Sequence, residues 1–128
     1  MIEKCAAIIV RNRRLLVVRK RGTSTFISPG GKMEKAEGQL DCLRRELREE
    51  LGVKLIEAER FGTYERRAEG EEYAIRIHAW LTSVDGVCLP HAEIEELGWI
   101  AGAPLLPVGS VFAECVIPEL VRRDLIDA

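Results

Sequence analysis

The sequence predicts one mixed α/β (α+β) domain that spans residues 1–128. A length of 128 residues suits a single hydrophobic core and leaves too little chain for a second one. Several short stretches are apolar or alternate between apolar and polar side chains, which is typical of strands. One central stretch has helical periodicity, and a second helix is expected near the C-terminus. Strands combined with two such helices make a mixed α/β or α+β domain.

The N-terminal part of the chain predicts a hairpin followed by a turn region. Residues 5–10 and 15–18 are apolar and rich in β-branched side chains, and the polar residues 11–13 between them indicate a turn. Three cations at 19–21 end the second strand. The Pro-Gly-Gly cluster at 29–31 favours tight turns with positive φ.

The central helix is predicted from about Gln39 to Leu51. Leucines recur along it at helical spacing, and Gly52 follows at the position where a glycine commonly ends a helix. This stripe is expected to pack on the core. It consists of Leu40, Leu43, Leu47 and Leu51.

Two long strands are predicted after the helix. Residues 53–67 are strand-like, residues 68–72 form a charged turn, and residues 73–84 alternate clearly between two faces. One face carries Tyr73, Ile75, Ile77, Ala79 and Leu81, and the other carries Arg76, His78 and Trp80.

The C-terminal part predicts one more strand and a final helix. The strand is expected at 94–100, and a loop rich in Pro and Gly follows at 101–109. Ser110 is expected to cap the helix, and Pro118 is expected to break or restart it before residues 119–126.

The charge balance argues against a partner attracted by a global field. The chain has 19 Lys plus Arg and 21 Asp plus Glu, for a formal net charge of -2. No apolar run reaches membrane-spanning length, and the N-terminus leads into a strand rather than into a signal-peptide core. We therefore expect a cytoplasmic protein that binds neither membranes nor, stably, nucleic acid.

The cysteines are far apart in sequence and form no recognisable motif. There is no C-x-x-C pair and no nearby His at metal-ligand spacing. We therefore expect four buried free thiols, and neither a zinc site nor a redox-active dithiol. The residues are Cys5, Cys42, Cys88 and Cys115.

Three glutamates of the central helix share one face. With 3.6 residues per turn, Glu49 and Glu50 lie about 60° and 40° to either side of Glu46. This face borders the leucine stripe, so it can lie at the edge of a cleft. The carboxylates repel one another, and a hard divalent cation such as Mg²⁺ would offset that repulsion. The alternative is a solvated face neutralised by neighbouring arginines.

Residues 31–53 resemble a complete Nudix box. The family's pattern is G, five residues, E, seven residues, then R-E-U-x-E-E-x-G-U, with U a bulky aliphatic residue. All nine specified positions agree, and the chance probability of such a match is below roughly one in 10⁸ per starting position. They are Gly31, Glu37, Arg45, Glu46, Leu47, Glu49, Glu50, Gly52 and Val53.

The resemblance extends beyond the box. Pro29 and Gly30 precede it as in many members, and residues 93–100 resemble a strand of MutT-like members. One departure is Ala36, at a position that is frequently Gly in the family. We expect this to alter the loop slightly and to leave the metal site intact.

The resemblance implies an α/β/α sandwich with a mixed β-sheet and a Mg²⁺-dependent hydrolase, with Mn²⁺ as an alternative ion. Metal ligands carried over by position are Glu46, Glu49, Glu50 and the carbonyl of Gly30. Glu37 would support the loop, paired with Arg45, and Gly31 and Gly52 would be structural. The general base varies within the family, so Glu46, Glu50 and, outside the box, Glu93 stay open as candidates. The expected catalytic residues are therefore Glu46, Glu50, Glu93 and Arg45.

Substrate contacts are expected from cations. Arg19 or Lys20 resembles the basic position from which MutT-like members contact phosphates, and Lys32 lies within the box. Arg76, with His78 and Trp80 on its strand face, either lines a nucleoside pocket or is covered by a helix.

Three functions are compatible with these residues. The first is a nucleotide pyrophosphohydrolase that converts a (deoxy)nucleoside triphosphate to a monophosphate and pyrophosphate. The second is hydrolysis of ADP-ribose or another nucleotide sugar. The third is a non-catalytic domain that senses a nucleotide, although such domains usually lose box acids. Exposed strands and a Pro-broken terminal helix are also compatible with a homodimer.

Overall fold

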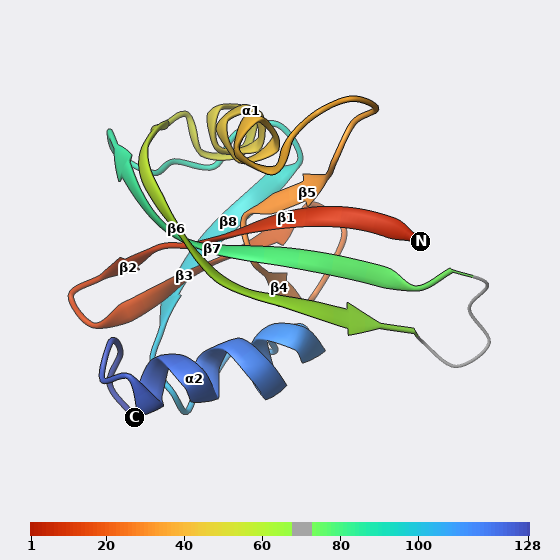
Figure 1. The fold of residues 1–128 in the computed structure, drawn as a ribbon. Coiled ribbons are helices and arrows are strands. Elements are labelled where there is room, and N and C mark those ends of the chain that lie inside the picture. The colour runs from red at the N-terminus through yellow and green to blue at the C-terminus, as the bar shows by residue number, and fades with distance from the viewer. Residues whose placement is uncertain (68–72) are drawn as a thin grey trace.

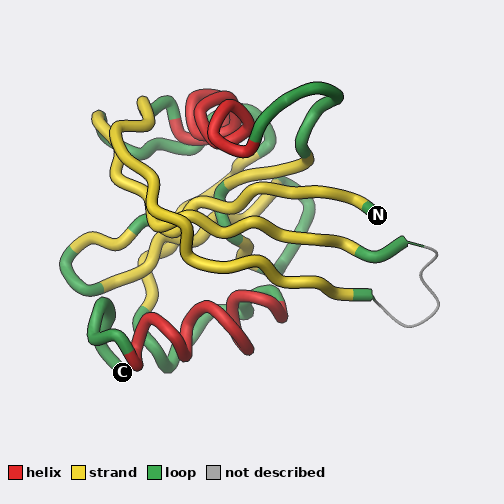
Figure 2. Tube along the Cα trace, viewed as in Figure 1, coloured by secondary structure: helices red, strands yellow, loops and turns green. Residues whose placement is uncertain are grey.

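The strands lie between two helical segments, one on each side. The computed structural model describes residues 1–67 and 73–128. Helix α1 (Gln39–Leu51) covers one side of the strands, and helix α2 (Ile117–Arg122), with the π-helical turn η1 (Phe112–Val116) before it, covers the other (Figures 1 and 2). The predicted mixed α+β sandwich is confirmed, with its strands divided between two sheets rather than one.

The first sheet is mixed and contains the longest strands. Its order is β5 (Gly30–Lys32), β1 (Ile2–Ile8), β7 (Ile75–Asp85) and β6 (Lys54–Arg66). Strands β1 and β7 are parallel, whereas β1 and β5, and β6 and β7, are antiparallel. The predicted turn at 68–72 between β6 and β7 lies outside the described residues.

The second sheet is antiparallel. Strand β3 (Arg14–Lys20) pairs with β2 (Val10–Arg11), β4 (Phe26–Ile27) and β8 (Ile94–Ile100). The predicted turn is confirmed: Asn12 and Arg13 both have positive φ, 51° and 61°, as a tight hairpin turn requires. The predicted hairpin, however, is shorter than expected, because β1 leaves it and joins the first sheet between β5 and β7.

Alternating side chains divide the core into two clusters. In β1, Cys5 and Ala7 face α1, whereas Ala6 and Ile8 face the C-terminal helical segment. Strand β3 and the predicted alternation of β7 follow the same rule. The buried leucines of α1 close one cluster, and Phe112, Val116 and Leu120 close the other. Every buried strand therefore contributes to both faces.

The C-terminal helix differs from the prediction at both ends and at its proline. The carbonyl of Gly109 accepts the first helical hydrogen bond, from Ala113, so Gly109 rather than Ser110 is the cap. Pro118 does not break the helix, because it falls in the first turn of α2, where its missing N–H is tolerated. In the π-helical turn before it, the N–H of Ile117 reaches back to the carbonyl of Phe112.

None of the helices in residues 1–67 and 73–128 is long and apolar enough to cross a membrane. The cytoplasmic location and the homodimer stay predictions from the sequence.

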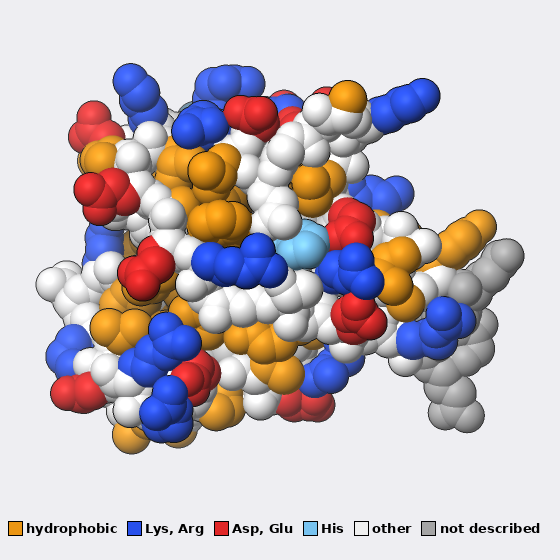
Figure 3. Space-filling view, in the orientation of Figure 1, with side chains coloured by type: hydrophobic (Ala, Val, Ile, Leu, Met, Phe, Trp, Pro, Cys, Tyr) orange, Lys and Arg blue, Asp and Glu red, His pale blue; other side chains and the backbone are white. Residues whose placement is uncertain are grey.

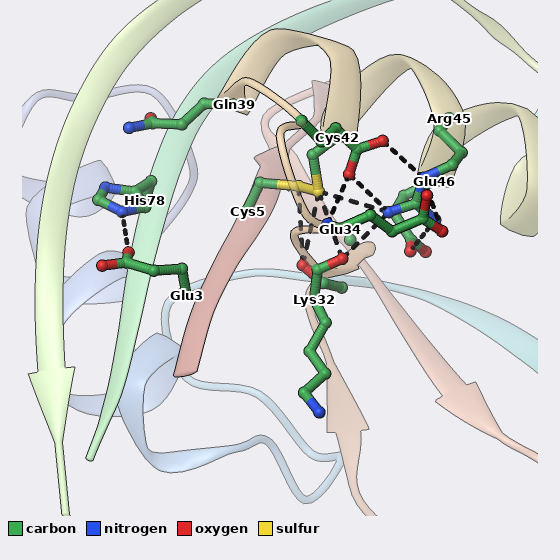
Figure 4. Close-up of a disulfide and its surroundings, with 12 residues drawn as sticks. Glu3, Cys5, Lys32, Glu34, Gln39, Cys42, Arg45, Glu46 and His78 are labelled. Atoms are coloured by element: carbon green, nitrogen blue, oxygen red, sulfur yellow. Dashed lines mark hydrogen bonds and ion pairs between the residues drawn. A yellow bond between two sulfur atoms is a disulfide. The ribbon is translucent and has the colours of Figure 1, made fainter. Parts of the chain in front are cut away.

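The prediction of four buried free thiols is wrong. Cys5 of β1 and Cys42 of α1 form a disulfide across 37 residues of chain, with their Cα atoms 6.5 Å apart (Figure 4). Spacing along the chain gave no sign of this pair, because only the packing of α1 on β1 brings the two residues together. Cys88 is a buried free thiol as expected, but Cys115 is only partly buried.

We predict that this disulfide stabilises the fold. Replacing Cys5 and Cys42 together by Ala should lower the free energy of unfolding by about 3–4 kcal/mol, because the cross-link restricts the unfolded chain over a loop of this length. Urea unfolding monitored by tryptophan fluorescence would measure the difference, with Cys115→Ser as the control.

Thiol titration provides the direct check. The unreduced protein, unfolded in denaturant, should expose only the two free thiols, Cys88 and Cys115. Four reactive thiols before reduction would contradict the disulfide.

Candidate active site

The acidic face of α1 lies against strand β5. The leucines of the helix are buried except Leu40, which was expected to pack on the core but is exposed in the first turn. On the face beside them, Glu46 and Glu50 approach the Gly30–Gly31 backbone, and Glu49 lies farther out. Glu50 is 1% exposed, whereas the side chains of Glu46 and Glu49 are 12% and 49% exposed. The helix therefore presents a series of carboxylates that runs from the core to solvent.

Glu50 is the most unusual of the three. Its carboxylate accepts a hydrogen bond from the N–H of Gly30 over 2.8 Å, in a buried position. The pKa of this carboxyl is raised to about 8, mainly by burial and also by nearby Glu46 and Glu93, against the effect of the Gly30 hydrogen bond. Burial also raises the pKa of Glu46. Glu50 therefore keeps a proton to a higher pH than an exposed glutamate does.

Two glycines allow this close approach. Gly30 has φ 136°, and a Cβ there would collide with the backbone carbonyl of Cys5. A Cβ on Gly31 would lie 2.7 Å from Oε1 of Glu46. The sequence Gly30-Gly31 is thus required to bring β5 against both β1 and the acidic face.

Arg45 joins the loop before α1 to the acidic face. Its guanidinium donates two hydrogen bonds to the carboxylate of Glu37, at 2.8 and 2.9 Å, and one of 2.7 Å to Glu46 (Figure 4). It also donates to the carbonyl of Lys32 over 3.0 Å. The Arg45 guanidinium lowers the pKa of Glu37 to about 2. The Glu37–Arg45 pair expected from the resemblance is therefore present and holds the loop to the helix.

Ala36, the departure from the box pattern, adopts a backbone conformation that glycine favours. Ala36 has φ 65°, in the left-handed region that glycine adopts without strain.

Glu93 and Lys20 lie beside the acidic cluster. Their charged groups are 3.8 Å apart, and Glu93 is close enough to influence the pKa of both Glu46 and Glu50. Glu93 immediately precedes β8 and is half-exposed, so its carboxylate is accessible to water. Although it is outside the box, the fold brings it to the candidate site.

A cleft of about 200 Å³ opens on the other side of Gly30 and Gly31. It lies between the two sheets and the first turn of the C-terminal helical segment. Its lining is largely apolar, with polar groups at its border. The lining includes Lys4, Lys20, Ile27, Ser28, Ile77, Ser110 and Phe112.

Oxygen donors in this cluster suit a hard cation, although they do not yet form a closed cage. Among the described residues, no three Asp, Glu, His or Cys side chains converge closely enough to surround a metal ion. Glu46 is held by Arg45 and Glu50 by Gly30. Mg²⁺ keeps several waters and needs only one or two direct carboxylates, so the donors fit this ion once Glu46 releases Arg45.

Two of the expected substrate cations lie away from this centre. Arg19 pairs with Glu96 at 2.9 Å and donates to the carbonyl of Thr23. Arg76 pairs with Glu3 and Glu65 and is on the face of β7 opposite Ile77, which lines the cleft. Lysine, arginine and acidic side chains intermingle around a histidine on the face of the molecule that Figure 3 views.

The neighbours of Arg76 on its strand face are also occupied. His78 is hydrogen-bonded to Glu3, and the indole N–H of Trp80 donates to Gln39 of α1 over 2.9 Å. Helix α1 therefore reaches Trp80 on this face, whereas Arg76 and His78 bond to acidic side chains of neighbouring strands.

Lys32 lies across the strand pair from Lys4, which the sequence analysis did not single out. The sequence did not identify three of the cleft residues, because they come from the two ends of the chain. They are Lys4, Ser110 and Phe112. The residues that follow Lys4 alternate between two faces of the core. A cation at such a position is the only local signal that could have identified Lys4 as a cleft residue.

The site thus joins an acidic helix face to a partly cationic cleft. A family model for the NUDIX domain matches residues 1–113. Over 84 residues, the chain is 38% identical to a CTP pyrophosphohydrolase of Escherichia coli strain K12, in a match that covers 62% of this chain and 61% of that protein.

Solved structures agree with this match. The solution structure of the ORF135 protein of E. coli has a TM-score of 0.77 and 32% identity, over 96% of this chain and 89% of that one. The MutT Nudix hydrolase of Burkholderia pseudomallei has a TM-score of 0.78 at 23% identity, over 94% and 95% of the two chains. The chain belongs to the Nudix family, since the family model matches most of its length.

We predict that the buried Glu50 makes the metal-free protein less stable as pH rises. Its folded-state pKa of about 8 lies above the ordinary 4.5, so between these values the folded protein holds a proton that the unfolded chain releases. The stabilisation is complete below pH 4.5 and is lost as pH rises toward 8, by at most about 1.4 kcal/mol per pH unit.

Urea unfolding in EDTA at several pH values between 5 and 8 would test this. Glu50→Gln should flatten the pH dependence and should be more stable than the wild type at pH 8. Identical pH profiles for the two proteins would show that Glu50 is not buried as an acid.

Proposed function

We propose that this chain is a Mg²⁺-dependent Nudix pyrophosphohydrolase, with Mn²⁺ as an alternative ion. Its substrate is a nucleoside diphosphate linked to a further group. The form that we favour is a (deoxy)nucleoside triphosphate, cleaved to a nucleoside monophosphate and pyrophosphate.

One observation carries this proposal: the acidic cluster and the cleft share a single border. Gly30 and Gly31 line the cleft, and the same two residues contact the carboxylates of Glu50 and Glu46. A nucleoside seated in the cleft would therefore extend its phosphates over the acids. The charged end of Lys20 lies at this border as well.

The ion would be held by Glu46, Glu49, Glu50 and the carbonyl of Gly30. When bound, Mg²⁺ would neutralise charge on the diphosphate and lower the pKa of a water. This role accounts for a row of glutamates that Arg45 alone does not neutralise.

Glu93 is our candidate for the general base, ahead of Glu46 and Glu50. It is close to both of these acids, is half-exposed and is paired only loosely with Lys20, so it can accept a proton from water. The water oxygen forms a bond to phosphorus, the anhydride P–O bond breaks, and the proton passes to the carboxylate. Arg45 keeps the helix and the loop in register through Glu37.

The size of the cleft favours a ligand that carries a single nucleobase. A volume of about 200 Å³ is below that of typical sites for larger ligands. The relative in E. coli is a CTP pyrophosphohydrolase, so CTP is the first substrate to test.

We predict that Glu49→Gln and Glu50→Gln each lower Mg²⁺-dependent turnover by about a hundredfold or more, because each removes a negative oxygen donor to the ion. Pyrophosphate release from CTP would measure this, and circular dichroism would confirm that the fold is retained. Glu57→Gln, on an exposed position of β6, is the matched control. Full turnover in both helix variants would rule out the metal assignment.

A substrate panel should identify the leaving group. We expect pyrophosphate, and not phosphate, from CTP or another triphosphate, with little turnover of ADP-ribose, nucleotide sugars, dinucleotides or capped RNA. Pyrophosphate and phosphate would be measured separately for each compound. Preferential turnover of a nucleotide sugar would replace the triphosphate assignment, and nucleotide binding without any turnover would indicate a sensor.

A further inference from the structure

Lys4 is a cation in the cleft for which the fold provides no carboxylate. It lies on β1, directly opposite Lys32 of β5, and it lines the cleft together with Lys20. Its side chain is partly buried. Within residues 1–67 and 73–128, Lys4 forms no ion pair with an acidic side chain.

The surroundings of Lys4 are electrostatically unfavourable for an ammonium group. Burial lowers its pKa, and the nearby charges of Lys20 and Lys32 lower it further. Lys4 and Lys20 thus line one cleft and Lys32 lies close to Lys4. Among the residues that the structure describes, the only carboxylate paired with any of these lysines is Glu93, 3.8 Å from Lys20. Such a cluster is stabilised when an anion binds.

The guanidinium groups near the site, unlike Lys4, are paired with carboxylates of the protein. Arg19 and Arg76 each pair with a carboxylate of the protein, and Arg45 is fully engaged with the loop and helix acids. A ligand that bound to any of these would first have to break an ion pair. Lys4 has no such competing partner in the part of the chain that the structure describes, and it faces the cleft.

Lys4 also has a suitable position along the cleft. It is on the same strand face as Ala6, whose backbone is paired with Gly30, and Gly30 contacts Glu50. Lys20 is close enough to influence the pKa of both Lys4 and Glu50. Along the cleft, Lys4 therefore comes first, Lys20 second and the acidic cluster last.

We propose that Lys4 is a substrate-binding residue whose ammonium group contacts the phosphate chain of the bound nucleotide on the cleft side of Lys20. This inference rests on the proposed function, since it assumes that the cleft receives a nucleotide. It adds a contact from the first strand, before the box begins.

Three variants separate this role from simple packing. Lys4→Met keeps the length and apolar stem of the side chain and removes its charge, whereas Lys4→Arg keeps the charge. Lys54→Met removes an exposed lysine of β6 as a matched control. Thermal melting would confirm that each variant folds.

Binding should first be measured in EDTA, with CTP and with inorganic tripolyphosphate as probes. Lys4→Met should weaken the binding of both by about tenfold, the effect expected for one charge-assisted hydrogen bond. Lys4→Arg should stay within about twofold of the wild type, and Lys54→Met should not differ. The loss should shrink at high salt, because the contact is between charges.

Steady-state kinetics with Mg²⁺ would then give the second readout. Lys4→Met should raise the KM for CTP with little change in kcat, as expected when a contact is equally strong in the ground state and the transition state.

The possible outcomes distinguish the two proposals. Wild-type binding of both anions by Lys4→Met would overturn the role of Lys4, and so would equal weakening by Lys4→Arg, which would indicate packing. Failure of the wild type to bind either anion would also overturn it. If Lys4→Met weakens metal-free binding but no compound is hydrolysed, the contact stands and the hydrolase assignment fails.

Discussion

The hydrogen bond between the backbone N–H of Gly30 and the buried carboxylate of Glu50 is the constraint on which the site depends. It joins α1 to β5 at the point where the cleft meets the acidic face. A buried carboxylate without a partner would be strongly destabilising, so this donor makes the position possible. Because Gly30 also lines the cleft, the same contact sets where a substrate would meet the acids.

Around this contact, charges of opposite sign are separated over a short distance. Acids occupy the helix side of Gly30 and Gly31, and lysines occupy the cleft side. Arg45 neutralises the outer part of the acidic face through Glu37 and Glu46, but Glu50 lies beyond its reach and shares its surroundings with Glu46 and Glu93. This separation of charge is the basis for the proposal that a cation binds on one side and a polyanion on the other.

Strong local patterns in the sequence predicted their elements accurately. The helix at 39–51, its glycine end at Gly52 and the strand at 94–100 match the structure, because helical spacing, a left-handed cap and a short apolar run are each local features. The predictions that failed depend on distant parts of the chain. The hairpin lost its first strand to another sheet, because β1 pairs with β5 and β7 instead.

The cysteines and the cleft illustrate the same limit. Cys5 and Cys42 are unrelated in sequence and become neighbours only because the leucines of α1 pack on β1. Lys4 and Phe112 come from opposite ends of the chain and meet at one cleft.

The sequence alone determined the family resemblance, the acidic helix face and the glycines beside it, because the residue types and their spacing within one short segment specify them. The tertiary structure decided which acid is buried, where the cleft lies and that Glu93 comes close to Glu46 and Glu50. Burial and charge pairing depend on which strands and helices become neighbours, and long-range packing determines that choice.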